Sequence, residues 1–435
     1  MNRTLKPLPQ LAATPSVEEE RLSLGRNFAW TLAGNVCYAA CQWGMLIAIA
    51  KLGTPTMLGE FALGLAIAAP VFMFTMLQLR AVLATDAGDE YFLGHYFAIR
   101  ILGTSIGLIA IAGFVAVAGF QRETAMVILL VSLAKAAESF SDIIYGFWQK
   151  HERFDRIAIA LTLRGIASLA ALAATLYFTR SIAWSIAAMA AVWTLWLLTY
   201  ERAGAKRVLA RVSPPDRLRP DWQWNKCKKL AVLAFPLGLV ILLVSLNANI
   251  PRYFVEHYLG EAALGYFAAM AYAFVAGNTV MAAIGQSALP RLARYFTLDP
   301  AAFVQLLKNM LLIGALIGIA GIGLAFWWGA AILRLLYRAE YAEYASVLTW
   351  LMVAAAVTYV ASMLGYGMMA ARVFRAQVPL FLAATAITAL ACRVLIPSKG
   401  LMGGAFAVLA GAVISCVGGG YIVFVAVRSR RSVTM

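Results

Sequence analysis

The chain has 435 residues, of which 63% are hydrophobic and only 13% are charged, and its formal net charge is +16. Soluble globular proteins are about half apolar and about a quarter charged, so a soluble enzyme, a disordered chain and a disulfide scaffold are all excluded. The basic residues lie between apolar segments rather than on one polar face, which argues against a nucleic-acid partner. The composition indicates a protein that crosses a membrane many times.

Apolar segments long enough to cross a bilayer recur along the whole chain. A crossing helix needs about 20 apolar residues. We expect such helices at 27–50, 61–79, 97–120, 125–149, 157–179, 182–200, 230–250, 265–288, 304–327, 347–371, 378–396 and 402–427. The expected organisation is a tail at 1–26, a six-helix bundle at 27–200, a basic linker at 201–229, a second six-helix bundle at 230–427 and a tail at 428–435. The predicted fold class is therefore all-α, with about twelve transmembrane helices in two bundles.

Lysine and arginine are distributed unequally between the two ends of these helices. The segments on the amino-terminal side hold 24 of the 36 basic residues, and those on the opposite side hold 8. Because cytoplasmic loops carry an excess of basic residues, this bias places both termini and the linker 201–229 in the cytoplasm.

A heptapeptide occurs twice, at the same place in each predicted bundle. Residues 58–64 (LGEFALG) and 259–265 (LGEAALG) match at six of seven positions. Each bundle has an even number of helices, so the two copies run parallel, as in transporters whose substrate site lies between two repeats. The same offset aligns Lys51 with Arg252, which lie where the first helix of each half leaves the membrane. They could bind substrate or anchor the helix ends.

Charged side chains also fall inside the predicted spans, where each carries a cost of about 2.5–3.5 kcal/mol at mid-bilayer. Lys135, Glu138 and Asp142 share one face of the fourth helix at helical spacing. Arg164 lies inside the fifth helix, and Arg100 begins the third. One interpretation is a hydrated cavity whose cations bind an anionic phosphate. The other is a neutral network in which these charges only pair with one another, and both remain open.

The first helix carries a milder polar stripe, and enzymatic motifs are missing. Thr31, Asn35, Tyr38 and Gln42 recur at helical spacing, which fits helix packing as well as contact with a sugar. The sequence has no phosphate-binding glycine loop and no HExxH motif. We therefore expect no enzymatic activity, no bound metal and no cofactor, while coupling to a proton or sodium gradient stays open.

Three stretches resemble a known family. They are 25–64, from Gly-Arg-Asn-Phe through the first heptapeptide copy; 79–86 (LRAVLATD); and 134–156, from Ala-Lys to the HERFDR sequence. These are similar to the Wzx-type polysaccharide or O-antigen flippases of the multidrug/oligosaccharidyl-lipid/polysaccharide (MOP) exporter superfamily. The resemblance is specific over residues 25–165 and only architectural after about residue 290.

The resemblance implies a MATE-like fold and a membrane transport activity. The expected function is the movement of a polyprenyl-diphosphate-linked oligosaccharide from the cytoplasmic to the outer leaflet of the bacterial inner membrane, by alternating access. Arg80 and Asp86 match the family stretch, and they would bind the substrate, form part of a gate or position other residues. The expected partners are that lipid-linked oligosaccharide, membrane lipid, a polysaccharide polymerase and a chain-length regulator. A multidrug/cation antiporter of the same superfamily is the main alternative, followed by a membrane-embedded polymerase.

Overall fold

The computed structural model describes residues 24–86, 91–210 and 218–434, and all regular structure in these ranges is helical. The helices are α1 (Leu24–Leu52), α2 (Pro55–Thr75), α3 (Leu79–Thr85), α4 (Leu93–Ala118), α5 (Arg122–Lys150), α6 (Phe154–Thr179), α7 (Ile182–Trp196), η1 (Leu197–Glu201), α8 (Arg202–Leu209), α9 (Trp224–Leu298), α10 (Pro300–Leu336), η2 (Ala339–Tyr344), α11 (Ala345–Ala370), α12 (Phe374–Lys399) and α13 (Leu401–Thr434). The all-α prediction is confirmed.

The described helices make twelve passes of membrane-spanning length. Ten helical segments are long and apolar enough to cross a bilayer. The helix α5 is also of membrane-spanning length, although it carries charges in its middle. The helix α9 provides two passes, one on each side of its interruption at Gly260. Gly260 has a φ of 82°, a left-handed conformation that glycine adopts without steric cost. The chain is therefore a multi-pass membrane protein of the predicted architecture.

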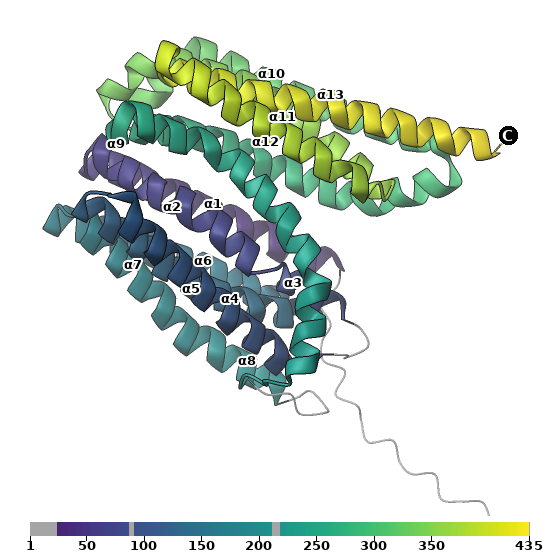
Figure 1. The fold of residues 1–435 in the computed structure, drawn as a ribbon, viewed down its shortest axis with the longest axis horizontal. Coiled ribbons are helices and arrows are strands. Elements are labelled where there is room, and N and C mark those ends of the chain that lie inside the picture. Colours follow the sequence, from purple (N-terminus) through teal and green to yellow (C-terminus); the bar gives the residue numbers. More distant parts are fainter. Residues whose placement is uncertain (1–23, 87–90, 211–217, 435) are drawn as a thin grey trace, which may run out of the picture.

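The helices form two groups joined by α9. Figure 1 shows α1–α8 in one group and α10–α13 in another, with the first part of α9 running diagonally from beside α3 toward the second group. We call α1–α8 the amino-terminal half and α9–α13 the carboxy-terminal half. The first part of α9 packs along α2, since Phe235 and Gly238 lie against Phe74 and the Tyr253 hydroxyl donates to the carbonyl oxygen of Ala66. The first part of α9 therefore contacts the amino-terminal half as well as the half to which it belongs.

Several helix ends differ from the expected bounds. Thr54 caps α2 by accepting a hydrogen bond from the backbone nitrogen of Met57, so this helix begins at Pro55 rather than at 61. It stops at Thr75, because Leu77 and Gln78 adopt left-handed conformations. Within the expected linker 201–229, helix continues to Leu209 and resumes at Trp224, and residues 211–217 lie outside the described ranges. The expected tail after 427 continues α13 to Thr434.

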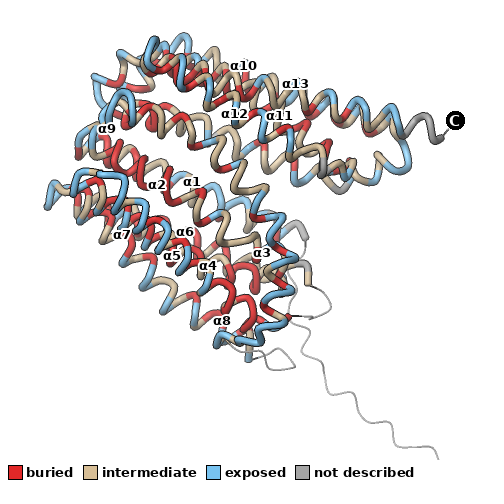
Figure 2. The backbone as a smooth tube through the Cα atoms, in the orientation of Figure 1, coloured by how far each residue is buried: buried red, intermediate tan, exposed pale blue. Residues whose placement is uncertain are grey.

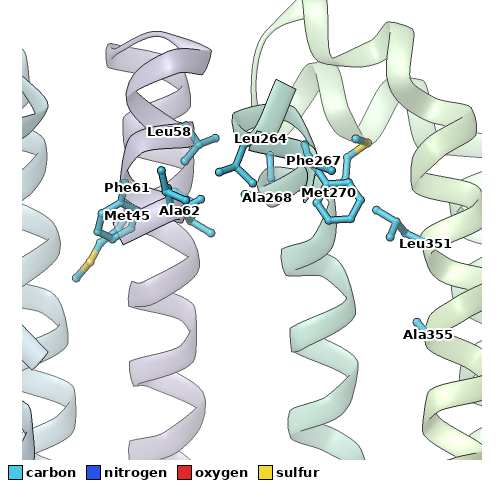
Figure 3. Close-up of a cluster of buried hydrophobic side chains, with 14 of the residues drawn as sticks. Met45, Leu58, Phe61, Ala62, Leu264, Phe267, Ala268, Met270, Leu351 and Ala355 are labelled. Atoms are coloured by element: carbon cyan, nitrogen blue, oxygen red, sulfur yellow. The ribbon is translucent and has the colours of Figure 1, made fainter. Parts of the chain in front are cut away.

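Burial separates the faces that helices turn toward one another from those they turn outward. Figure 2 shows buried positions inside each group and exposed ones along the outer faces. Large apolar side chains such as Ile109, Phe178 and Trp327 are 71%, 80% and 73% exposed, which fits contact with lipid. The main core runs from Met45 on α1 and Phe61 on α2, through Phe267 on α9, to Leu351 on α11 (Figure 3). It therefore connects the two halves.

The two heptapeptide copies lie against each other. A Cβ atom on Gly59 would lie 1.7 Å from the carbonyl oxygen of Glu261, and one on Gly265 would lie 2.0 Å from that of Pro55. We call this end of the molecule, where α1 ends, α2 begins and α9 is interrupted, the Gly260 end. At the same end, Lys51 donates from Nζ to the carbonyl oxygen of Leu335 (2.9 Å), and Arg338 donates to the carbonyl oxygen of Lys51 (2.8 Å). The halves are thus in close contact at the Gly260 end.

Candidate functional site

A polar cavity of about 570 Å³ lies in the amino-terminal half, and we call it the charged cavity. It is lined by residues of α1, α2, α3, α5 and α6, together with the loop between α2 and α3. Five of the nine residues predicted to bind substrate line it, namely Arg80, Lys135, Glu138, Asp142 and Arg164. The helical face predicted for the fourth span therefore points into a cavity rather than toward lipid.

Glu138 forms the centre of one group of charges in this cavity. Its carboxylate lies 2.6 Å from the Lys135 ammonium group, one helical turn away on α5, and 3.7 Å from the Arg164 guanidinium group on α6. Tyr38 of α1 donates a hydrogen bond from its hydroxyl to Glu138 (3.2 Å), and Gln42 donates to the Tyr38 oxygen (2.7 Å). The polar stripe of the first helix thus contacts the charged face of α5.

Asp142 forms the centre of a second group. One of its oxygens lies 3.0 Å from Nη2 of Arg100, and the other lies 3.7 Å from Nη1 of Arg80. The Arg100 side chain is fully buried behind the cavity wall, whereas the Arg80 side chain is 36% exposed. Arg100 therefore positions Asp142 without reaching the cavity, and Arg80 remains accessible from it.

Arg164 is enclosed by aromatic rings. Its guanidinium carbon lies 4.9 Å from the ring centre of Trp193, 5.3 Å from that of Tyr38 and 5.8 Å from that of Tyr145. Only 1% of the Arg164 side chain is exposed. Planar guanidinium groups stack well on aromatic faces, so these contacts fix the position of the cation. Arg164 thus orients Glu138, while Lys135 is the more accessible cation of this group.

The charges around the cavity do not cancel. The lining has three cations, Arg80, Lys135 and Arg164, against two carboxylates, Glu138 and Asp142. Behind this lining, Arg100 adds a cation and the buried Glu201 adds a carboxylate. The formal charge of the described groups is therefore +1. The neutral network considered from the sequence contained Lys135, Arg164, Glu138 and Asp142. In the structure Lys135 and Arg164 both pair with Glu138, and the partners of Asp142 are Arg80 and Arg100 of other helices.

The remaining predicted residues lie elsewhere. Asp86 ends α3 and accepts a hydrogen bond from the backbone nitrogen of Tyr91 (3.2 Å), and it is not among the residues that line the charged cavity. Lys51 is exposed at the Gly260 end. Arg252 lines a different cavity, in the carboxy-terminal half. The repeat therefore relates Lys51 and Arg252 in sequence, but their surroundings differ.

Sequence reasoning missed three groups that shape the site. Tyr145 lines the cavity and donates from its hydroxyl to Glu201 (2.7 Å), and Gln149 accepts a hydrogen bond from Nε of Arg80 (3.2 Å). Tyr145 and Gln149 lie on α5 within one to two turns of Asp142, so the helical period would have found them. Glu201 was assigned to the linker. It is brought inward by the π-helical turn η1, a wider turn that the sequence does not reveal.

Known proteins resemble this chain in sequence and in fold. Models of known protein families give no match. The capsular polysaccharide biosynthesis protein CapF of Staphylococcus aureus is 31% identical over 319 residues, which cover 73% of this chain and 78% of that protein. The lipid II flippase MurJ in an inward closed conformation gives a TM-score of 0.72 at 12% identity, over 91% of this chain and 87% of that one. An inward-facing MATE multidrug resistance transporter gives a TM-score of 0.71 at 11% identity, over 93% of this chain and 100% of that one.

The two structural likenesses establish a shared fold, and the sequence likeness spans most of both chains. Together with the twelve passes and the paired repeats, they confirm the family expected from the sequence. The chain belongs to the family of the capsular polysaccharide biosynthesis protein CapF, and it has the fold of the MATE and MurJ transporters.

Proposed function

We propose that this protein moves a polyprenyl-diphosphate-linked oligosaccharide from the cytoplasmic to the outer leaflet of the bacterial plasma membrane. The observation that carries the proposal is the charged cavity, whose described charges sum to a formal +1 and which exposes Arg80 and Lys135. A diphosphate is a compact anion, and arginine and lysine donors bind its oxygens through charge-assisted hydrogen bonds. The apolar chain would remain in lipid while the headgroup enters.

The proposed direction follows from where the cavity and the closed end lie. From Lys135 to Gln149 the lining of α5 spans fifteen residues, fourteen helical rises or about 21 Å, from mid-helix to its basic end. The bias of basic residues assigns that end, and both termini, to the cytoplasm. The contacts at the Gly260 end would then close the outer side, a state suited to loading cargo from the cytoplasm. Alternating access requires those contacts to open later.

The carboxylates of the cavity suggest how transport would be coupled. Glu138 and Asp142 are each shared by two cations, so an arriving diphosphate would compete for those cations and free a carboxylate for a proton or a sodium ion. A polysaccharide polymerase and a chain-length regulator would receive the product. Measuring transport with and without a proton or a sodium gradient distinguishes the coupling ion.

Neutralising the accessible cations is expected to impair transport while the protein still folds. We expect Lys135→Gln and Arg80→Gln each to lower the flipping rate about tenfold or more, because one charge-assisted hydrogen bond contributes about 1.5–3 kcal/mol. Each carboxylate keeps its buried arginine partner in these variants. The measurement is the appearance of lipid-linked oligosaccharide on the outer face of proteoliposomes.

The matched control is Lys308→Gln, which removes an exposed lysine from α10 outside the charged cavity and should leave the rate unchanged. Wild-type rates in Lys135→Gln and Arg80→Gln would remove the cavity from the proposal. The proposal itself fails if purified protein moves no lipid-linked oligosaccharide in any ion gradient. Drug-dependent ion flux in the same vesicles would instead support the antiporter.

A further inference from the structure

A tryptophan behind the wall of the charged cavity contacts two of its cations. Trp193 lies on α7, which contributes no residue to the lining, and it is only 2% exposed. The guanidinium carbon of Arg164 lies 4.9 Å from the centre of its ring, and the ammonium nitrogen of Lys135 lies 5.9 Å from it. Both distances are within the reach of a cation–π interaction, which extends to about 6 Å. Trp193 therefore links a cation of α5 to a cation of α6.

The indole of Trp193 is held by the helix that carries Arg164. Its Nε1 donates a hydrogen bond to the hydroxyl oxygen of Ser168 (2.7 Å), and that hydroxyl donates to the backbone carbonyl oxygen of Arg164, one turn earlier on α6. Ser168 is fully buried, so both hydrogen bonds lie in a medium of low dielectric constant, where they are strong. The ring is thus fixed relative to the backbone of α6, and the two cations are fixed relative to the ring.

Hydrogen bonds alone do not account for the burial of the Arg164 guanidinium group. Its Nε and Nη1 atoms are buried and have no hydrogen-bond partner among the described residues. A guanidinium group is more weakly hydrated than an ammonium group and stacks on aromatic faces, so neighbouring rings can stabilise it where such partners are missing. In the part of the chain that the structure describes, Trp193 has the nearest of these rings, and the same ring faces Lys135.

An aromatic ring holds a cation without cancelling its charge. The face of the ring is negative but the residue is neutral, so Trp193 leaves the formal charge of +1 of the described cavity groups unchanged. A carboxylate at the same position would neutralise one cation, and an arriving anion would have to displace it. The ring does not attract the anion itself, because its face is negative. A cation held by Trp193 therefore stays available to a phosphate.

We propose that Trp193 is a positioning residue for cargo binding: its ring keeps Lys135 and Arg164 in place while an incoming diphosphate replaces Glu138 as their counter-ion. This inference rests on the proposed function, which brings a diphosphate to these cations. Glu138 lies 2.6 Å from Lys135 and 3.7 Å from Arg164, so it is the group that the diphosphate displaces. Without the ring, the two like charges would move apart once the carboxylate is displaced, and the diphosphate would lose their combined attraction.

The test weakens the electrostatic attraction of the ring and leaves its shape almost unchanged. In the full-length protein, the indole of Trp193 is replaced by its mono-, di- and trifluoro derivatives, in which fluorine withdraws electron density from the ring face. The measurement is equilibrium binding of inorganic pyrophosphate to each protein in nanodiscs of neutral lipid. We expect the affinity to fall with each added fluorine, by about 2–30-fold over the series, which corresponds to the loss of one cation–π interaction.

The matched control is the same fluorine series at Trp148. This tryptophan is also fully buried in the amino-terminal half, and within the described residues no cation lies over its ring. Fluorination of Trp148 should leave pyrophosphate binding unchanged. Lys135→Gln identifies the site of binding: it should weaken pyrophosphate binding tenfold or more and make the remaining affinity less sensitive to fluorination of Trp193, because one of the two cations at the ring is then missing.

Three results would overturn the inference: no binding of pyrophosphate to the wild type, an affinity that does not change with fluorination of Trp193, or an equal change with fluorination of Trp148. The last two would assign Trp193 to packing alone. These results are independent of flipping. A protein whose pyrophosphate affinity follows the fluorine series at Trp193 but which moves no lipid-linked oligosaccharide retains the positioning role and loses the proposed function. One that flips normally although its affinity ignores the series loses only the positioning role.

Discussion

Gly265→Ala is expected to separate the two halves at the Gly260 end and to lower transport about fivefold to 150-fold. The added Cβ would lie 2.0 Å from the carbonyl oxygen of Pro55, which is backbone and cannot rotate away. Overpacking of this kind costs about 1–3 kcal/mol, and here the cost falls only on the state in which the two halves touch. The same energy shifts a two-state equilibrium by about 5–150-fold.

The reciprocal change, Gly59→Ala, meets the carbonyl oxygen of Glu261 and should act in the same direction. Spin labels at the exposed positions Thr56 and Leu335, one in each half, should report a longer distance in either variant. Flipping of the lipid-linked oligosaccharide in proteoliposomes provides the functional measurement. Loss of transport together with a longer distance identifies these contacts as the outer closure.

The matched controls are Gly113→Ala and Gly323→Ala, one in each half, where a Cβ atom meets nothing within 4 Å. Alanine favours helix over glycine by about 1 kcal/mol, so these variants should be slightly more stable and transport normally. If Gly265→Ala and Gly59→Ala behave like these controls, the contact between the two heptapeptide copies is not part of the transport cycle.

Hydrophobic length predicted the number of passes, but it could not place the ends of the helices. Lipid requires an apolar stretch of a certain length, and this requirement is visible in the sequence. Outside the lipid, caps and turns decide where each helix begins and ends. Thr54 and Pro55 start α2 early, and the turn η1 carries α7 on into α8. The sequence also predicted two separate helices, at 230–250 and 265–288, where the structure has the one element α9. Gly260 interrupts this element without a loop between its two parts.

The charged cavity was predictable in part. The period of a helix placed Lys135, Glu138 and Asp142 on one face, and the cost of charge in lipid required that face to meet protein or water. Which cation meets which carboxylate depends on how separate helices pack, so the pairing of Asp142 with Arg80 and Arg100 could not be deduced. The repeat likewise predicted equivalent positions for Gly59 and Gly260, but not the contact between the two copies.

Asp142→Asn is expected to cause the largest loss of stable protein among changes to the charged cavity. Arg100 is fully buried, and its Nε and Nη1 atoms have no hydrogen-bond partner among the described residues. Asp142 supplies the only ion pair of Arg100 in these residues. Removing one partner of a buried pair costs about 3–5 kcal/mol, because the other charge stays buried without compensation. Unfolding of purified protein in detergent measures this loss directly.

The contrast that makes this test specific is Asp155→Asn. Asp155 pairs with Arg153 at the start of α6, and the Arg153 side chain is 23% exposed where that of Arg100 is fully buried, so water can reach the cation left behind and the loss should be smaller. Equal losses in the two variants would mean that the burial of Arg100 does not set the cost of losing its carboxylate. Replacing both members, Arg100→Met with Asp142→Leu, should recover most of the stability, since an apolar pair of similar size is often neutral or better.

The double variant also separates stability from transport. It leaves the contacts of Gly59 and Gly265 between the two halves unchanged, but it removes the carboxylate that lies 3.7 Å from Arg80. If Asp142 serves only to hold Arg100, flipping should return together with stability. If Asp142 also keeps Arg80 oriented toward the charged cavity, the double variant should be stable and still transport slowly. Adding Arg80→Gln to the double variant should then lower the flipping rate less than Arg80→Gln lowers the rate of the wild type. That non-additivity would assign Asp142 a role in transport as well as in folding.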